Sequence, residues 1–230
     1  MQAGFTALEA GLVRAKNSIN VAMKNFSDTL FSLIGFYIIG FGIMFGVSID
    51  GLFGSSAFLL EGKSEPYDYA YFIFQAVFAG TAATIVSGAI AERMKFEGYL
   101  ISSIMISVLI YPVFGHWVWN ADGWLAKSGF VDFAGSTVVH SIGGWVGLAG
   151  AIILGARIGK FDENGKPRDI LGYSIQTSVV GVFILWFGWF GFNGGSTLVA
   201  DGSVAKIIVN TILSGAIGGI VCLMLSKIID

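Results

Sequence analysis

The chain has 230 residues, of which 55% are hydrophobic and 12% are charged. Soluble domains carry about a quarter charged residues, so this composition and a mean hydropathy of +0.77 predict a membrane protein. The formal net charge of −2 provides no basic excess for nucleic acid and no acidic tail that would indicate disorder. The single cysteine, Cys222, can form no disulfide within the chain.

The first segment, 1–13, is apolar except for Gln2 and Glu9, and it is too short to cross a hydrocarbon core about 30 Å thick. It has no basic start or cleavage site, so it does not resemble a signal peptide. Two interpretations stay open: a partial helix whose first half precedes the numbering, which we favour, and a helix inserted halfway. The first would make the chain a truncated gene product, a partial gene model or part of a longer protein.

Six further apolar runs reach the length of about 20 residues that a membrane span needs. They lie at 26–48, 69–91, 98–119, 133–156, 172–195 and 206–228. Cytoplasmic loops carry an excess of Lys and Arg, and this layout places ten of the 13 basic residues on one side. Those ten are Arg14, Lys16, Lys24, Arg93, Lys95, Arg157, Lys160, Lys166, Arg168 and Lys227. The loops at 49–68, 120–132 and 196–205 are therefore expected to face outward.

No linker or composition shift divides the chain, so we expect one all-α membrane domain over residues 1–230, a polytopic helical bundle. Three Gly-xxx-Gly pairs, each suited to a close helix contact, begin at Gly42, Gly143 and Gly215. Glu92 and Arg93 end a predicted span at its cytoplasmic surface, where we expect a solvated or ion-paired anchor.

Ionisable groups at membrane depth are costly and usually face a bundle interior or a cavity. The candidates are Glu9, Asp28, Asp132, His116 and His140. Asp132 directly precedes the 133–156 span, so we expect it to cap that helix. For His116, beside two tryptophans at an outer end, we favour an interfacial ring. Glu9 is either a buried partner or a residue near the surface, and the sequence leaves both open.

His140 lies about one third of the way along its span. A neutral imidazole has one donor and one acceptor, so it either bonds to another helix or lines a path for a small polar solute. Helical spacing predicts that it shares one face with Thr137, Gly144 and Gly147. The same spacing groups Phe74, Phe78 and Thr81 on the 69–91 helix, where aromatics are more often packing than function.

Five stretches, in this order along the chain, resemble the ammonium transporter family (Amt/Mep/Rh). They are 2–17 (QAGFTALEAGLVRAKN), 88–96 (GAIAERMKF), 116–119 (HWVW), 132–140 (DFAGSTVVH) and 186–196 (WFGWFGFNGGS). The resemblance covers essentially the whole chain and implies a fold of eleven helices. In it, helices one to five and six to ten form inverted repeats, and three subunits form a homotrimer. This chain would supply part of helix one through helix seven, an incomplete set.

The resemblance also implies a transport path. Its residues would be Trp119, Ser196 and Phe74 at an outer recruiting site, Phe78 and Phe192 as a stacked gate, His140 in the pore, and Asp132 as a support for the site. The second pore histidine of the family belongs to helix ten, which these 230 residues do not contain. The resemblance implies no cofactor or metal. The implied partners are ammonium or ammonia, the bilayer of the cell membrane and a PII-type regulatory protein on the cytoplasmic side.

The function implied is transport of ammonium or ammonia: recruitment as the ion, deprotonation near the gate and conduction of ammonia past His140. Whether such transport is electrogenic stays open. An ammonium sensor, or the membrane module of a signalling protein, is the alternative from a different class. A membrane enzyme that uses His140 and Asp132 is disfavoured, because no nucleophile, metal cluster or phosphate loop accompanies them. We therefore expect a protein that is not an enzyme.

Overall fold

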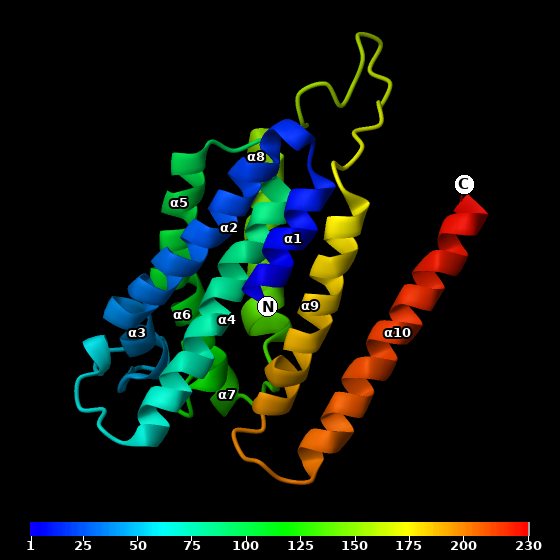
Figure 1. Ribbon diagram of the computed structural model, residues 1–230. Coiled ribbons are helices and arrows are strands. Elements are labelled where there is room, and N and C mark those ends of the chain that lie inside the picture. The colour runs from blue at the N-terminus through cyan, green and yellow to red at the C-terminus, as the bar shows by residue number, and fades with distance from the viewer. Residues whose placement is uncertain (230) are drawn as a thin grey trace.

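The computed structural model describes residues 1–229 and is built almost entirely of helices (Figure 1). Within these residues, six helical segments are long and apolar enough to cross a membrane. They are Ala15–Phe45, Pro66–Ile90, Phe96–Lys127, Ser136–Leu154, Ile175–Gly195 and Ser203–Ile229. The prediction of an all-α, polytopic membrane bundle is confirmed.

Three of the six segments contain a π-helical turn, and three are continuous α-helices. The interrupted ones are α2 (Ala15–Gly35), η1 (Phe36–Gly40) and α3 (Phe41–Phe45); α5 (Phe96–Met105), η3 (Ile106–Ile110), α6 (Tyr111–Trp119) and the short α7 (Trp124–Lys127); and η4 (Ser136–Ser141) with α8 (Ile142–Leu154). The continuous ones are α4 (Pro66–Ile90), α9 (Ile175–Gly195) and α10 (Ser203–Ile229). A π-helical turn inserts an extra residue and is frequent at functional sites, so residues beyond it no longer follow α-helical spacing.

The helix α4 forms the centre of the bundle and packs against α2 and α8. Its buried face is made of small residues, among them Ala76, Ala79 and Ala82, which let neighbouring helices come close. A Cβ atom added to Gly143 of α8 would meet the Cβ of Ile85 of α4 at 2.6 Å, so the two backbones touch at this glycine.

The short helix α1 (Gln2–Leu12) packs along α9, far away in sequence (Figure 1). Glycines make this contact possible on both sides. A Cβ atom on Gly4 would lie 2.8 Å from the side chain of Leu185, and one on Gly181 would lie 2.7 Å from the carbonyl oxygen of Gly4. Any larger side chain at either position forces the two helices apart.

The first spanning helix begins at Ala15, although hydropathy places its start at 26. The difference arises because the first half of α2 is rich in polar residues, some of them exposed, such as Lys16 and Asn20, and some of them buried. Lys24, Asn25 and Asp28 of α2 are all buried. A hydropathy sum cannot distinguish such partnered polar groups from exposed ones.

These polar residues belong to a buried cluster that joins α1, α2, α4 and α5. Asn25 Nδ2 donates to the Glu9 carboxylate at 2.9 Å, and Gln2 Nε2 donates to Asp28 at 2.6 Å. The hydroxyls of Ser87 and Tyr99 donate to Glu9 and Asp28, respectively. Glu9 is thus a buried partner rather than a surface residue, and the bundle interior satisfies both carboxylates.

A short antiparallel ribbon covers one end of the bundle, formed by β1 (Ser48–Ile49) and β2 (Phe53–Gly54) and followed by η2 (Phe58–Leu60). Asp50 and Gly51 have positive φ at its turn, as expected of Asp-Gly in a hairpin. The ribbon packs on the last turn of α6. His116 of that turn is completely buried, so the expectation of an interfacial ring is wrong: the ribbon covers it.

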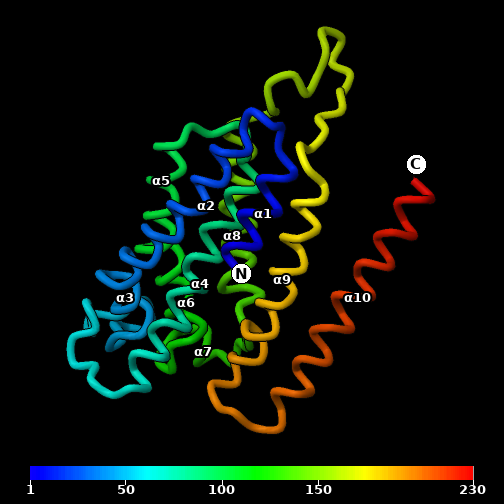
Figure 2. Tube along the Cα trace, viewed as in Figure 1, coloured from blue at the N-terminus to red at the C-terminus, as the bar shows by residue number. Residues whose placement is uncertain are grey.

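The helix α10 forms one edge of the bundle and packs against α9 (Figure 2). Thr211 is the one residue of Ser203–Ile229 that is buried. The connection from α8 to α9 extends beyond the ends of the helices as a hairpin (Figure 2). That hairpin holds several of the basic residues expected on the cytoplasmic side.

Candidate functional site

Four aromatic rings from three helices meet at the centre of the candidate site. On α4, Phe74 and Phe78 lie one helical turn apart with ring centroids separated by 4.6 Å. Phe78 reaches Phe192 of α9 at 4.2 Å and Trp119 of α6 at 6.0 Å. The Phe78 and Phe192 planes cross at 62°, so the rings meet edge to face, a preferred aromatic geometry, and not as the parallel stack that the family resemblance implies.

His140 lies directly behind this aromatic pair, with its ring centroid 5.6 Å from that of Phe192 and 5.3 Å from that of Trp189. Its Nδ1 is 3.1 Å from the carbonyl oxygen of Gly135. A carbonyl only accepts, so Nδ1 carries the proton and Nε2 holds a lone pair. Within residues 1–229, Nε2 is buried and has no hydrogen-bond partner.

The ring of His140 lines a cavity of about 560 Å³ between η4, α9 and α10. Its other lining residues include Ser136, Trp189, Asn193 and Thr211. His140 therefore makes no hydrogen bond to another helix among the described residues and lines this cavity with its ring, which favours the second of the two interpretations left open by the sequence.

The predicted common face of Thr137 and His140 is wrong. Thr137 lines a different cavity, which it shares with Trp145 on the other side of the helix. The cause is the π-helical turn η4, in which the His140 amide donates to the carbonyl of Gly135, five residues back. The extra residue rotates His140 away from the position that α-helical spacing assigns to it.

Asp132 caps the helix that carries His140, as predicted, although that helix begins at Ser136 and Gly135 is its N-cap residue. Its carboxylate accepts hydrogen bonds from the backbone amides of Gly135, Ser136, Thr137 and Val138 at 2.7 to 3.1 Å, and from the Thr137 hydroxyl at 2.5 Å. Burial raises the pKa of Asp132, but these hydrogen bonds outweigh burial and hold the pKa below its usual range. The group is a carboxylate at neutral pH and offsets the positive end of the helix dipole.

Trp119, one of the four rings, lies on α6, and Ser196 is the C-cap residue of α9. The Trp119 indole donates to the backbone carbonyl of Asp132 at 2.7 Å, which fixes the ring orientation. The Ser196 hydroxyl donates to the carbonyl of Phe192 at 2.8 Å and keeps its lone pairs free to accept. Among residues 1–229 no hydrogen bond joins Ser196 to Trp119.

Three cavity residues were not singled out from the sequence: Trp189, Asn193 and Thr211. Trp189 precedes Phe192 by three residues on the continuous helix α9, and this spacing alone could have placed both rings on one face. Asn193 Nδ2 donates to the Thr211 hydroxyl at 3.0 Å and joins α9 to α10; no local signal predicts this pair. In the part of the chain that the structure describes, no three His, Cys, Asp or Glu residues gather to hold a metal ion.

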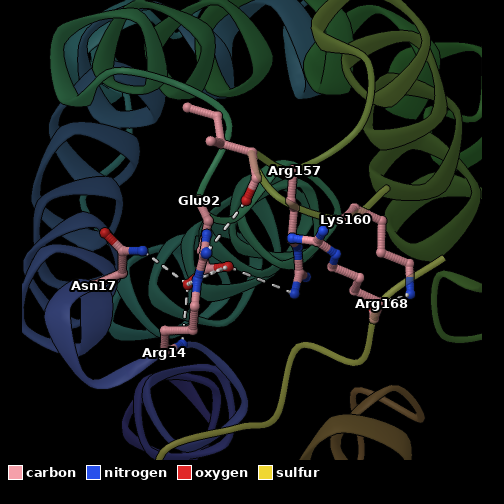
Figure 3. Close-up of polar contacts among 7 residues, drawn as sticks. Arg14, Asn17, Glu92, Arg157, Lys160 and Arg168 are labelled. Atoms are coloured by element: carbon pink, nitrogen blue, oxygen red, sulfur yellow. Dashed lines mark hydrogen bonds and ion pairs between the residues drawn. The ribbon is translucent and has the colours of Figure 1, made fainter. Parts of the chain in front are cut away.

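A second charged centre lies at the opposite end of α4. Figure 3 shows Arg14, Asn17 and Arg157 converging on the carboxylate of Glu92, whose side chain is 0% exposed. The Arg14 Nε to Glu92 Oε1 distance is 3.0 Å, and Arg157 lies at 3.8 Å from Oε2. Burial raises the pKa of Glu92, but hydrogen bonds from Arg14 and Asn17 and the charge on Arg14 outweigh it and lower the pKa. These contacts link the α1–α2, α4–α5 and α8–α9 connections to one another.

The family model described as the Ammonium Transporter Family matches residues 1–230. The chain belongs to this family. With its six apolar helical segments, it is therefore a multi-pass integral membrane protein.

Relatives and solved structures agree with this membership. The ammonium transporter Amt2 of Archaeoglobus fulgidus is 47% identical over 98% of this chain and 51% of its own length. Ammonium transporter 1 member 3 of Solanum lycopersicum is 43% identical over 97% of this chain and 53% of its own length. A solved "Sensor Amt Protein" is 45% identical, with a TM-score of 0.93, over 97% of this chain and 57% of that one. The chain spans about half the length of the curated relatives it matches.

Proposed function

We propose that the protein transports ammonium or ammonia across a membrane. The observation that carries the proposal is His140, whose ring lines a cavity beside Phe192 of the phenylalanine pair and whose buried Nε2 has no hydrogen-bond partner within residues 1–229. A buried acceptor without a partner is costly, and a small molecule with N–H groups would satisfy it. Family membership supports the same substrate.

Recruitment takes place at the outer aromatic cluster, with Trp119 and Phe74 offering ring faces and Ser196 a hydroxyl oxygen. A cation over an aromatic face gains about 0.5 to 2 kcal/mol, and the hydroxyl accepts one N–H of the ammonium ion. These contacts favour ammonium over water, but potassium has the same charge and gains from the rings too. Selection between the two cations therefore falls to the next step.

The edge-to-face pair of Phe78 and Phe192 blocks the path from the recruiting site to the cavity beside His140. A hydrophobic constriction disfavours a hydrated ion, and a bare charge at the membrane centre costs from about 3 to more than 10 kcal/mol. Ammonium avoids that cost by giving up a proton to water on the outer side of the gate, which leaves neutral ammonia to pass; an alkali ion has no proton to lose. Ammonia then donates an N–H to Nε2 of His140, while Asp132 holds the helix turn in place.

A homotrimer in the cell membrane and a PII-type regulatory protein on the cytoplasmic side belong to the same proposal, on the family resemblance alone. A second candidate function is ammonium sensing, in which the site binds its ligand without useful flux. It is favoured by the likeness to the solved "Sensor Amt Protein".

The recruiting site is tested with Trp119→Leu in uptake assays on the full-length protein. Loss of a contact worth about 0.5 to 2 kcal/mol raises the half-saturating ammonium concentration about 2- to 30-fold. Trp124→Leu is the matched control, because Trp124 is exposed on the same outer end, away from the four rings. An unchanged half-saturating concentration in the folded Trp119 variant removes this residue from the role.

A further inference from the structure

His116 is a completely buried histidine that the transport path described above does not use. It lies in the last turn of α6, three residues before Trp119. Its Nδ1 is 2.9 Å from the carbonyl oxygen of Met44, and its Nε2 is 2.8 Å from the Ser48 hydroxyl. The ring therefore connects α6 to the end of α3 and to the outer ribbon.

The two partners fix the protonation state and the orientation of the ring. A backbone carbonyl only accepts, so the Met44 bond requires a proton on Nδ1 of His116. Nε2 is then the acceptor, and the Ser48 hydroxyl donates to it. The Ser48 oxygen in turn accepts from the amide of Gly51 at 3.1 Å, in the turn of the ribbon. Both ring nitrogens are satisfied, and a flipped ring would break both bonds.

The outer ribbon and the end of α6 form one hydrogen-bonded unit, which we call the outer cap (residues 44–54 and 116–124). Four further bonds join its two halves: Asn120 Nδ2 to the Met44 and Gly46 carbonyls at 3.3 and 3.1 Å, Trp117 Nε1 to the Leu52 carbonyl at 2.8 Å, and the Trp124 amide to the Gly51 carbonyl at 3.2 Å. Of these links, only His116 is buried completely and bonded at both ends of its side chain.

Trp119 lies on this unit and is held from two sides. Its indole is tied to Asp132, and its backbone belongs to the helical turn that begins at His116, whose carbonyl accepts from the Asn120 amide at 3.2 Å. Rotation of this turn would move the Trp119 ring relative to Phe78, 6.0 Å away. Trp117 and Asn120 restrain this turn from less buried positions, and His116 restrains it from a completely buried one.

We propose that His116 is a positioning residue for ammonium recruitment: through Met44 and Ser48 it fixes the last turn of α6 and so sets the Trp119 ring face toward the incoming ion. The inference rests on the proposed function, since it assigns Trp119 to recruitment. His116 itself touches no substrate. A residue that only stabilised the fold would change the amount of folded protein and not the substrate affinity that depends on Trp119. The test therefore measures substrate affinity.

The test measures uptake of labelled methylammonium into liposomes by the full-length protein, with KM and maximal rate determined separately. The variants are Ser48→Ala, His116→Ala and Trp119→Leu, with the double variant of the last two. Ser55→Ala is the matched control, because its hydroxyl lies in the same loop and donates to the Val47 carbonyl instead of contacting His116.

We expect His116→Ala and Ser48→Ala to raise KM about 2- to 10-fold, the fold-change that loss of one net hydrogen bond produces, with the maximal rate nearly unchanged. The double variant should have the KM of Trp119→Leu alone, because the two residues act through one ring. Ser55→Ala should have the wild-type KM.

Unchanged KM in Ser48→Ala and His116→Ala, or multiplied effects in the double variant, would overturn the inference while leaving transport intact. A fall in maximal rate at constant KM would also overturn it. If His116→Ala does not fold, Ser48→Ala, which removes a single hydroxyl, decides alone. Absence of uptake by the wild-type protein would overturn the proposed function itself, and the inference with it.

Discussion

Replacing Asp132 should destabilise the helix that carries His140. The carboxylate accepts from four consecutive backbone amides and from the Thr137 hydroxyl. Asp132→Ala leaves these donors without their acceptor in a buried position. Loss of an N-cap costs about 0.5 to 2 kcal/mol, and hydrogen bonds to a charged group contribute about 1.5 to 3 kcal/mol. We therefore expect Asp132→Ala to lower the free energy of unfolding by about 2 to 4 kcal/mol.

The loss should depend on pH with a definite sign. The pKa of Asp132 is lower in the folded protein than its usual value, so the unfolded chain binds the proton more tightly. The carboxylate then contributes stability at every pH above its unfolded pKa, about 4, and that contribution disappears as pH falls through the folded pKa. The difference in stability between wild type and Asp132→Ala should be constant near neutral pH and shrink below about pH 4.

Thermal unfolding in detergent measures this difference. A loss of 2 to 4 kcal/mol corresponds to a fall in melting temperature of about 4 to 16 °C for a chain of this size. Asp122→Ala is the control, because Asp122 is exposed and pairs only with exposed Lys127 at 3.0 Å, a contact worth at most about 1 kcal/mol. Equal melting temperatures of the Asp132 and Asp122 variants, or a difference that grows toward acid pH, would refute the capping role.

Two further predictions concern the packing of the bundle. Glu92→Gln removes the buried partner of Arg14 and should lower the free energy of unfolding by about 1 to 3 kcal/mol. Glu97→Gln, at an exposed position, should have little effect. Equal melting temperatures of the Glu92 and Glu97 variants would contradict this prediction. Gly181→Ala should lower stability by about 1 to 3 kcal/mol, because its Cβ meets the backbone of α1. Gly191→Ala on the same helix meets nothing within 4 Å and should not be destabilising, so a similar loss in both variants would be evidence against close packing at Gly181.

The contact between Phe74 and Phe78 could be predicted from spacing because α4 is a continuous helix, whereas Phe192 and Trp119 were assigned only from the family resemblance. Phe74 and Phe78, four residues apart, are in ring contact as α-helical spacing requires. The same reasoning failed for Thr137 and His140, because η4 is a π-helical turn. Nothing in the local composition predicts the extra residue of this π-helical turn. The turn is identified only from the hydrogen bond between the His140 amide and the carbonyl of Gly135.

Polar residues were the second source of error, because hydropathy scores a side chain by type and not by its partners. Lys24 and Asn25 delayed the predicted start of the first span, although both are buried and hydrogen-bonded inside the bundle. His116 was expected at an interface, since its neighbours in sequence are tryptophans. Its burial depends on Ser48, 68 residues away, and a contact over that separation leaves no trace in a single sequence.

Uptake of labelled methylammonium into liposomes by the folded, full-length protein tests the proposed function most directly. The proposal predicts saturable uptake that ammonium inhibits, and no uptake of potassium itself, because only ammonium and its methyl analogue can pass the phenylalanine pair as neutral molecules. Uptake of methylammonium equal to that of empty liposomes, or uptake of potassium as fast as that of methylammonium, would contradict it.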